Sequence, residues 1–129
     1  MIEFVDYIEG INAMMLQGFF EGWKKPLSPE THLEILRNSD HVVLAINRDC
    51  GKVVGFITVL TDHIQSAFIP LLEVLPDYRG QGIGSTLVSK MLEKLKGIPC
   101  IDLTCDPHLQ AFYKRSGMIT SVGMVIRDY

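Results

Sequence analysis

Three glycines at alternate positions, with an arginine just ahead of them, are the residues of this sequence best suited to chemistry. They are Gly80, Gly82 and Gly84, preceded by Arg79. An apolar run ending at a proline lies before them, and residues 83–95 carry apolar side chains at helical spacing. This pattern predicts a strand, a tight loop and a helix. Because the first N–H groups of a helix have no partner inside it, the loop is predicted to bind a phosphate or pyrophosphate.

The spacing of the glycines in the loop can be compared with the known phosphate-binding motifs. A P-loop carries a lysine after its last glycine, whereas Ser85 follows Gly84 here. A dinucleotide fingerprint, G-x-G-x-x-G, would have a third glycine at the position of Ser85, although Asp102 lies at a suitable distance for its acidic residue. That fingerprint usually opens an array of βαβ units, and here most predicted strands precede the loop. A dinucleotide site therefore stays an alternative that the order of the elements disfavours.

The run from Arg79 to Gly84 matches the pattern [RQ]-x-x-G-x-[GA], and it resembles the acyl-CoA-binding loop of the GNAT superfamily of N-acetyltransferases. Val74-x-Pro76 ahead of the loop adds to the resemblance, as does the run 109–118, which is similar to the family segment A-x-x-x-[FL]-Y-x-x-x-G-[FM]. The resemblance covers residues 41–118. It implies an α/β fold, an α+β mixed sheet flanked by helices, in which two parallel strands, 68–75 and 100–105, splay apart around the pantetheine arm.

The resemblance also assigns residues to acetyl-CoA as the cosubstrate, with no metal. The backbone of residues 81–86 would hold the pyrophosphate, and the end of the preceding strand would pair with the pantetheine amides as an added strand does. The family often has asparagine where Asp106 stands, so Asp106 is expected above all to cap the helix that Pro107 opens. The predicted cosubstrate-binding residues are Leu72, Glu73, Val74, Arg79, Gly80, Gln81, Gly82, Ile83, Gly84, Ser85, Thr86 and Asp106.

Tyr113 is expected to act on the leaving group. It matches the family tyrosine whose hydroxyl protonates or hydrogen-bonds the departing CoA thiolate, where negative charge develops. The alternative is that Tyr113 is a core residue, because it follows Phe112 on the predicted inner face of its helix. The attacking amine must lose a proton, and Glu73, Asp62 and His63 are candidate bases, with a water relay as the alternative. Glu73 is therefore predicted, with Tyr113, to be catalytic.

Composition and charge limit the class of protein. Hydrophobic residues make up 47% and charged residues 21% of the chain, which is typical of one soluble globular domain over residues 1–129. The net charge of −3 and the lack of a basic run argue against nucleic-acid binding. We find neither a signal peptide nor an apolar stretch near the roughly 18 residues that a membrane span needs. Three cysteines without metal-site spacing predict reduced thiols and a cytoplasmic location.

The remaining elements follow from local patterns. They are a strand at 4–7, a helix at 10–22, a helix that Ser28 caps, a hairpin of 42–46 and 53–60, a helix at 81–96, a strand at 101–104, a helix from 106 to 117 and one or two strands in 118–128. This order predicts a mixed sheet whose strands on either side of helix 81–96 are parallel. The apolar end of the chain, 118–126, suggests a homodimer.

The predicted function is acetyl-CoA-dependent N-acetyl transfer to a primary amine, by direct attack in a ternary complex. The acceptor would be an amine of a small molecule or of a protein, and the aromatic stretch 19–23 is expected near its pocket. The alternative is a non-catalytic acyl-CoA-binding or regulatory module, which does not need the hydroxyl of Tyr113.

Overall fold

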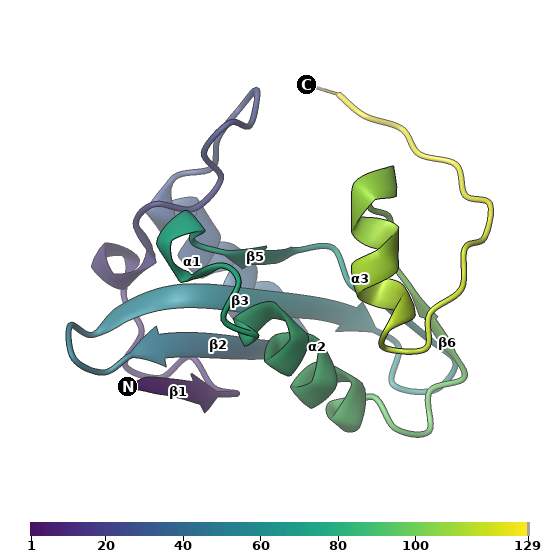
Figure 1. The fold of residues 1–129 in the computed structure, drawn as a ribbon, viewed down its shortest axis with the longest axis horizontal. Helices are drawn as coiled ribbons and strands as arrows, with labels where there is room; N and C mark the ends of the chain where they lie inside the picture. Colours follow the sequence, from purple (N-terminus) through teal and green to yellow (C-terminus); the bar gives the residue numbers. More distant parts are fainter. Residues whose placement is uncertain (129) are drawn as a thin grey trace.

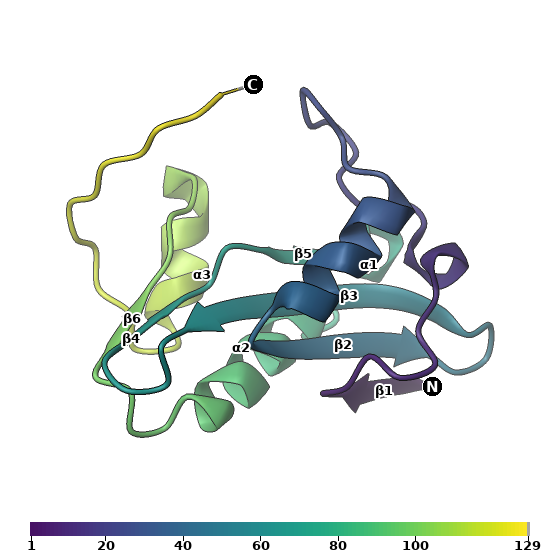
Figure 2. The same cartoon turned by 180° about the vertical axis from the view of Figure 1, so that it is seen from behind.

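The computed structural model of the protein describes residues 1–128, and a mixed sheet lies at its centre (Figure 1). Figures 1 and 2 show helix α2 on one face of this sheet and helix α1 on the other. The predicted fold class is therefore confirmed. The elements in order are β1 (Ile2–Val5), η1 (Ala13–Leu16), α1 (Pro29–Asn38), β2 (His41–Asn47), β3 (Lys52–Thr61), β4 (Ser66–Phe68), β5 (Leu72–Val74), η2 (Pro76–Tyr78), α2 (Ile83–Lys94), β6 (Cys100–Asp102), η3 (Pro107–Leu109) and α3 (Gln110–Lys114).

The strands run in the order β1-β2-β3-β4-β6, and β5 pairs with β3 beside this path. The predicted hairpin is present as the antiparallel pair β2 and β3, which aligns Val43 with Ile57. Strands β4 and β6 are parallel, with Ser66 opposite Cys100, and α2 lies between them in the chain. This is the parallel arrangement that the order of elements predicts.

The strand predicted over 68–75 is divided into β4 and β5. Pro70 lies in the gap, and its ring nitrogen cannot donate a hydrogen bond to a neighbouring strand. Both pieces pair with β3, β4 near its end and β5 near its middle, where Phe56 lies opposite Glu73. Only β4 continues onto β6. The predicted strand 68–75 therefore separates from β6 after β4, which is the splayed arrangement that the resemblance implies.

The helix predicted over 10–22 is wrong, because this stretch contains only the short 3₁₀ turn η1 and irregular backbone. Gly18 and Gly22 have φ angles of 97° and 84°, and Phe20 between them has a φ of 67°. These left-handed residues break any helix. The helix-like apolar spacing arises instead because a compact loop buries Leu16, Phe19 and Phe20 against the sheet.

The core is formed by β2 and β3 between the two helices. Gly55 faces α2, since a Cβ atom there would lie 3.2 Å from Ile83 and from Leu87. The next residue, Phe56, faces the other side, where its ring packs against Phe19 and against His32 of α1. Helix α1 begins as predicted, with the Ser28 side chain accepting a hydrogen bond from Thr31 N.

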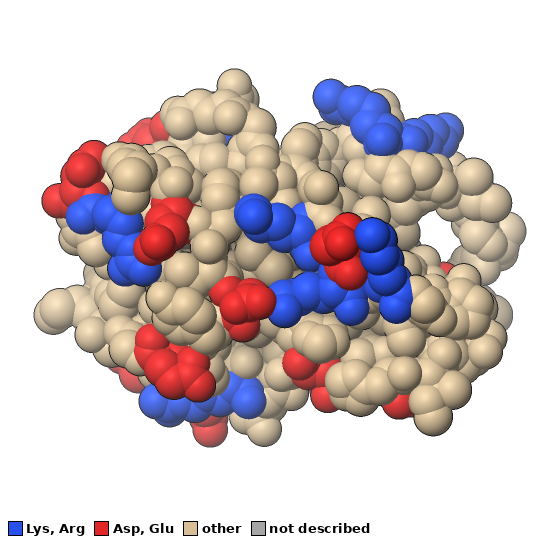
Figure 3. Space-filling view, turned by 90° about the horizontal axis from the view of Figure 1, so that it is seen from below, with Lys and Arg blue, Asp and Glu red and all other residues tan. Residues whose placement is uncertain are grey.

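The end of the chain differs from its prediction. Residues 118–128 contain no strand, and Figure 1 shows them in an arc that leaves the body of the protein after α3. Gly117 ends the preceding helix as expected, with a φ of 93°. No helix among residues 1–128 is long and apolar enough to cross a membrane. Basic and acidic side chains are interspersed on the face seen in Figure 3.

Candidate active site

A hollow of about 810 Å³ opens between β5, the glycine loop and α3. It brings together most of the residues predicted from the sequence, including Tyr113 and Glu73, although Gln81 and Thr86 are not among its lining residues. The lining residues that the sequence did not single out for the cosubstrate or the catalysis are Glu21, Trp23, Tyr78, His108, Leu109, Phe112 and Arg115. One cavity therefore contains the predicted cosubstrate loop and both predicted catalytic side chains.

The glycine loop leaves free N–H groups at the start of α2. Gly82 is the N-cap residue, with a φ of 83°, and it has no side chain to cap the helix. The first turn is closed by Thr86 N, which donates to Gly82 O at 3.1 Å. The N–H groups of residues 83–85 precede that bond, so they have no partner within the helix. Their open position and the helix dipole suit an anion.

The three glycines of the loop differ in what they do. Gly80 and Gly82 have φ angles of 79° and 83°, and a Cβ atom on either would meet nothing within 4 Å. They are needed for their backbone conformation, beside open space. Gly84 lies within α2, and a Cβ atom there would stand 3.4 Å from the ring of Phe112 and 3.8 Å from Val74. Gly84 therefore allows close packing of α2 on α3 and β5.

One edge of β5 faces the hollow. Thr58 N donates to Leu71 O at 3.0 Å, and Leu75 N donates to Val54 O at 2.9 Å, so residues 71 and 75 are bonded to β3. Because antiparallel bonding alternates along a strand, the backbone groups of Leu72 and Val74 point to the opposite edge. Among the described residues no other strand pairs with that edge. It is the edge on which an extended amide-containing ligand could add as a strand.

Arg79 connects the loop to this edge. Its Nε donates a hydrogen bond to Val74 O at 2.8 Å. The guanidinium is thus held beside the end of β5, and Arg79 is one of the residues that line the hollow. The sequence predicted a contact from Arg79 to the cosubstrate, and the structure shows a second role in fixing the strand end.

The carboxylate of Glu73 is bonded to a distant loop. Phe20 N donates to both of its oxygens, each at 3.2 Å. Burial raises the pKa of Glu73, while the bond from Phe20 and the charge of Arg79 act in the opposite direction. A carboxyl group with a raised pKa is a better proton acceptor than an exposed one.

Tyr113 lies in the hollow from α3. Burial raises the pKa of its phenol, and nearby Cys105 adds to the shift. The phenol therefore stays protonated at neutral pH and is able to donate a hydrogen bond or a proton. Its ring packs edge-on against Phe112, with centroids 5.0 Å apart. The ring of Tyr113 therefore packs against a neighbouring side chain, as a core tyrosine would, but the residue also lines the hollow.

The other two candidate bases lie elsewhere. Asp62 Oδ1 accepts hydrogen bonds from the N–H groups of residues 64–66 at 2.8–3.1 Å, and these bonds lower its pKa. His63 Nε2 lies 3.6 Å from Asp40 Oδ1. Both residues shape the turn between β3 and β4, and neither lines the hollow. Asp62 and His63 are candidate bases by residue type, but the sequence does not show that the turn between β3 and β4 lies away from the hollow.

Asp106 and the 19–23 stretch agree only in part with expectation. Asp106 occupies the N-cap position before η3 and lines the hollow, but its side chain makes no capping hydrogen bond. Phe19 and Phe20 are buried in the core. Trp23, which is 46% exposed, and Glu21 do line the hollow at the end near Glu73.

Residues 8–118 match the sequence profile of the acetyltransferase (GNAT) family. The chain belongs to this family. A curated relative, the uncharacterized N-acetyltransferase ycf52 of Gracilaria tenuistipitata var. liui, is 34% identical over 105 residues, which are 77% of this chain and 56% of that protein. This chain therefore spans little more than half the length of the curated relatives it matches.

Solved GNAT structures share the fold. A chain from Deinococcus radiodurans R1, assigned as an acetyltransferase, is 41% identical with a TM-score of 0.94, and the match covers 98% of this chain and 87% of that one. The GNAT family protein SP0256 of Streptococcus pneumoniae TIGR4 is 27% identical with a TM-score of 0.80, over 99% of this chain and 98% of that one. The predicted family and its mixed sheet are confirmed.

Proposed function

We propose that the protein is an acyltransferase that moves the acetyl group of acetyl-CoA to a primary amine, by direct attack while both substrates are bound. Residues 1–129 act as one domain in this proposal. The observation that carries it is that the phenol of Tyr113, the free edge of β5 and the open N–H groups of α2 all line one hollow. Family membership and relatives named N-acetyltransferases support it.

The donor side of the hollow fits acetyl-CoA. The N–H groups of residues 83–85 would hold the pyrophosphate, and the backbone of Leu72 and Val74 would pair with the pantetheine amides. Arg79, already bonded to Val74 O, adds positive charge near the phosphates. Acetyl-CoA supplies an activated thioester carbonyl. The protein's contribution is to hold it in a fixed position, since proximity lowers the barrier to attack.

The proton transfers have candidates on both sides of the reaction. Glu73, with its raised pKa, would take the proton from the acceptor amine, directly or through a water. Tyr113, whose pKa is raised also, would donate to the thiolate as it leaves. Glu21 and Trp23 line the end of the hollow near Glu73, where the acceptor would enter. An amine of a small molecule or of a protein fits this scheme.

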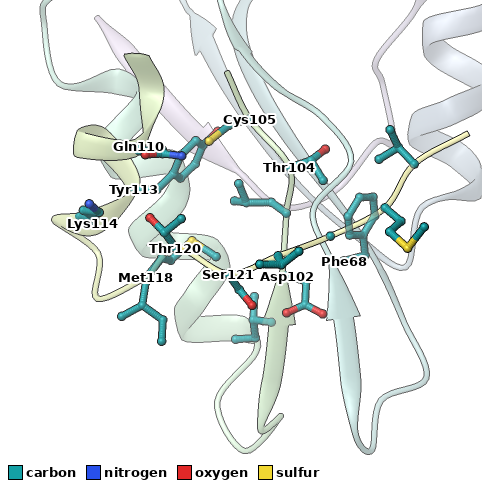
Figure 4. Close-up of a pocket in the computed structure, with 17 residues that line it drawn as sticks. Phe68, Asp102, Thr104, Cys105, Gln110, Tyr113, Lys114, Met118, Thr120 and Ser121 are labelled. Atoms are coloured by element: carbon teal, nitrogen blue, oxygen red, sulfur yellow. The ribbon is translucent and has the colours of Figure 1, made fainter. Parts of the chain in front are cut away.

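A covalent enzyme intermediate is not part of the proposal. Cys50 and Cys100 are exposed, and Cys105 lines a different hollow, on the other side of Tyr113 (Figure 4). None of the three lines the hollow that contains the glycine loop. The amine is therefore proposed to attack the thioester itself.

Two measurements test the proposed function. Calorimetry with acetyl-CoA, ATP and NAD should show binding of acetyl-CoA alone, and preference for a nucleotide would overturn the choice of cosubstrate. A panel of amines and lysine peptides should then give acetylated product by mass spectrometry. Binding of acetyl-CoA with no acetylation of any panel member would instead favour the non-catalytic binding module.

A further inference from the structure

The phenol of Tyr78 makes a hydrogen bond to a part of the chain far from it in sequence. Asn47 Nδ2 donates to Tyr78 Oη at 3.0 Å, and the two residues are 31 positions apart. Asn47 is the last residue of β2, and Tyr78 is the last residue of η2, just ahead of the glycine loop. Figure 1 shows the end of β2 and the segment after β5 at the same end of the sheet. The bond therefore joins the hairpin of β2 and β3 to the start of the loop.

The direction of this bond follows from the other contacts of Asn47. Its side-chain oxygen accepts from Asp49 N at 3.0 Å. Because a backbone N–H can only donate, the amide oxygen faces Asp49 and the NH₂ group faces Tyr78. The backbone oxygen of Asn47 accepts from Gly51 N at 2.7 Å. The turn thus holds Asn47 through both its main chain and its side chain, and the donor that it offers to Tyr78 has a fixed position.

The segment 76–82 has few other anchors. Among the described residues, each of its other hydrogen bonds goes to a residue at most five positions away. Gly80 and Gly82 add no side-chain packing, and a Cβ atom on either would meet nothing within 4 Å. The half-buried ring of Tyr78 packs against the core, but apolar packing has no preferred direction. The bond from Asn47 is therefore the contact that fixes where Tyr78, and the backbone after it, enters the loop.

We propose that Tyr78 and Asn47 are positioning residues for the cosubstrate. Their hydrogen bond holds the segment 76–82 so that the N–H groups of residues 83–85 are directed at one phosphate position before the ligand arrives. A preformed site needs no ordering on binding, so loss of the bond should weaken binding. Neither residue is proposed to act on the reacting atoms. The inference rests on the proposed function, since it assumes that these N–H groups hold the pyrophosphate of CoA.

The alternative is that the bond only stabilises the fold. In that case its loss would lower the free energy of unfolding, while the folded protein would bind CoA as tightly as before. A positioning role predicts the opposite pattern, in which a folded variant has a lower affinity for CoA. Binding and unfolding measured on the same variants therefore separate the two roles.

Calorimetric titration with CoA tests the inference through Tyr78→Phe, which removes only the hydroxyl. Its dissociation constant should rise roughly fivefold, the usual net effect of one hydrogen bond. The KM for acetyl-CoA should rise by a similar factor while kcat stays within about twofold, because Tyr113 and Glu73 are unchanged. Tyr7→Phe, at an exposed tyrosine, is the matched control and should keep the wild-type values. Urea unfolding of each variant would show that it is folded under the assay conditions.

Asn47→Leu removes the donor from the other side of the bond. It should weaken CoA binding at least as much as Tyr78→Phe, because the turn also loses its bond from Asp49 N. Combining Asn47→Leu with Tyr78→Phe should cause no further loss, since either change alone already breaks the bond. The control is Asn38→Leu, because Asn38 Nδ2 donates to Glu34 O on the exposed surface of α1, and it should bind CoA as the wild type does.

Two results would overturn the inference while leaving the proposed function in place. One is a folded Tyr78→Phe variant that binds CoA as tightly as the wild type. The other is a double variant whose loss of affinity is the sum of the two single losses, because the two residues would then act separately. A wild-type protein that bound no CoA would instead overturn the proposed function, and this inference with it.

Discussion

The backbone N–H of Phe20 donates hydrogen bonds to both carboxylate oxygens of Glu73, each at 3.2 Å. Phe20 has a φ of 67°, a conformation that non-glycine residues adopt at a cost. The bond joins the loop that carries Glu21 and Trp23 to β5, where the pantetheine arm is proposed to pair. The carboxylate proposed to accept the amine's proton therefore also holds the acceptor end of the hollow in shape.

Glu73→Gln should lower turnover by roughly 10²-fold or more, the usual contribution of a general base. The amide oxygen still accepts from Phe20 N, so the loop should keep its conformation. In the wild type, activity should fall as the pH falls through the raised pKa of Glu73, because only the ionised carboxylate accepts a proton. Initial rates against pH measure this.

The control for this prediction is Glu93→Gln, on the exposed surface of α2. It should keep both the wild-type rate and its pH profile. If Glu73→Gln retained full turnover with the acidic limb unchanged, Glu73 would be a positioning residue only and water would carry the proton.

Gly82→Ala should weaken acetyl-CoA binding by roughly tenfold, since a left-handed conformation costs an alanine about 1–2 kcal/mol. The loop would relax and turn the N–H groups of residues 83–85 away from the phosphates. Gly97→Ala is the matched control, because Gly97 also has a positive φ of 92° with open space around it, but it lies beyond the other end of α2. Both variants should lose similar stability, and calorimetry should show the loss of affinity for Gly82→Ala alone. Equal losses of affinity would mean that the loop does not bind the phosphates.

His32 should make stability depend on pH. It is fully buried, neither ring nitrogen has a hydrogen-bond partner among the described residues, and burial lowers its pKa from 6.5 to about 4. The unfolded chain binds a proton near pH 6.5 while the folded chain does not, so stability is present above that pH and is lost as the pH falls toward 4. The loss at pH 5 should be about 2 kcal/mol.

Urea unfolding of wild type and His32→Leu at pH 7 and pH 5 tests this. The difference between the two proteins isolates His32, because every other titrating group is common to both. We expect the variant to lose less stability than the wild type on acidification. Parallel losses in the two proteins would show that His32 is protonated in the folded state as readily as in the unfolded one.

Local signals in the sequence were sufficient for part of the fold. Ser28 and Pro29 mark the start of α1 because a cap acts over three residues. The glycine loop and the helix after it are predictable for the same reason, because their conformations depend on residues that are close together in the sequence. Family resemblance then added Tyr113, which local patterns alone assign equally well to the core.

Other features depend on contacts between distant parts of the chain. Phe20 and Glu73 are 53 residues apart, and no local pattern predicts that a loop will replace the helix expected at 10–22. The apolar spacing of Leu16, Phe19 and Phe20 is the same whether a helix or a folded loop buries them. The only local sign in the sequence is the presence of Gly18 and Gly22, whose φ angles are positive in the structure, and glycines in a helical pattern are ambiguous.

Residues 118–128 show a different limit. Their apolar composition predicts a strand, but a strand also needs an edge to pair with, and composition does not show where such an edge lies; the structure contains no strand there. Likewise, Asp62 is a candidate base by its residue type, whereas the family resemblance and Pro107 place Asp106 at a helix start. Only the structure shows that the Asp62 carboxylate accepts hydrogen bonds within a turn and that Asp106 lines the hollow.

The most direct test of the account is the effect of Tyr113→Phe on acetyl transfer. CoA-thiol release with an amine that the wild type acetylates should fall by roughly 10²-fold, while calorimetric affinity for acetyl-CoA stays within about twofold, because the ring and its packing on Phe112 are kept. Tyr7→Phe, at an exposed tyrosine away from the hollow, should match the wild type in both measurements. Unchanged turnover in Tyr113→Phe would contradict the account, since the phenol would then take no part in the reaction.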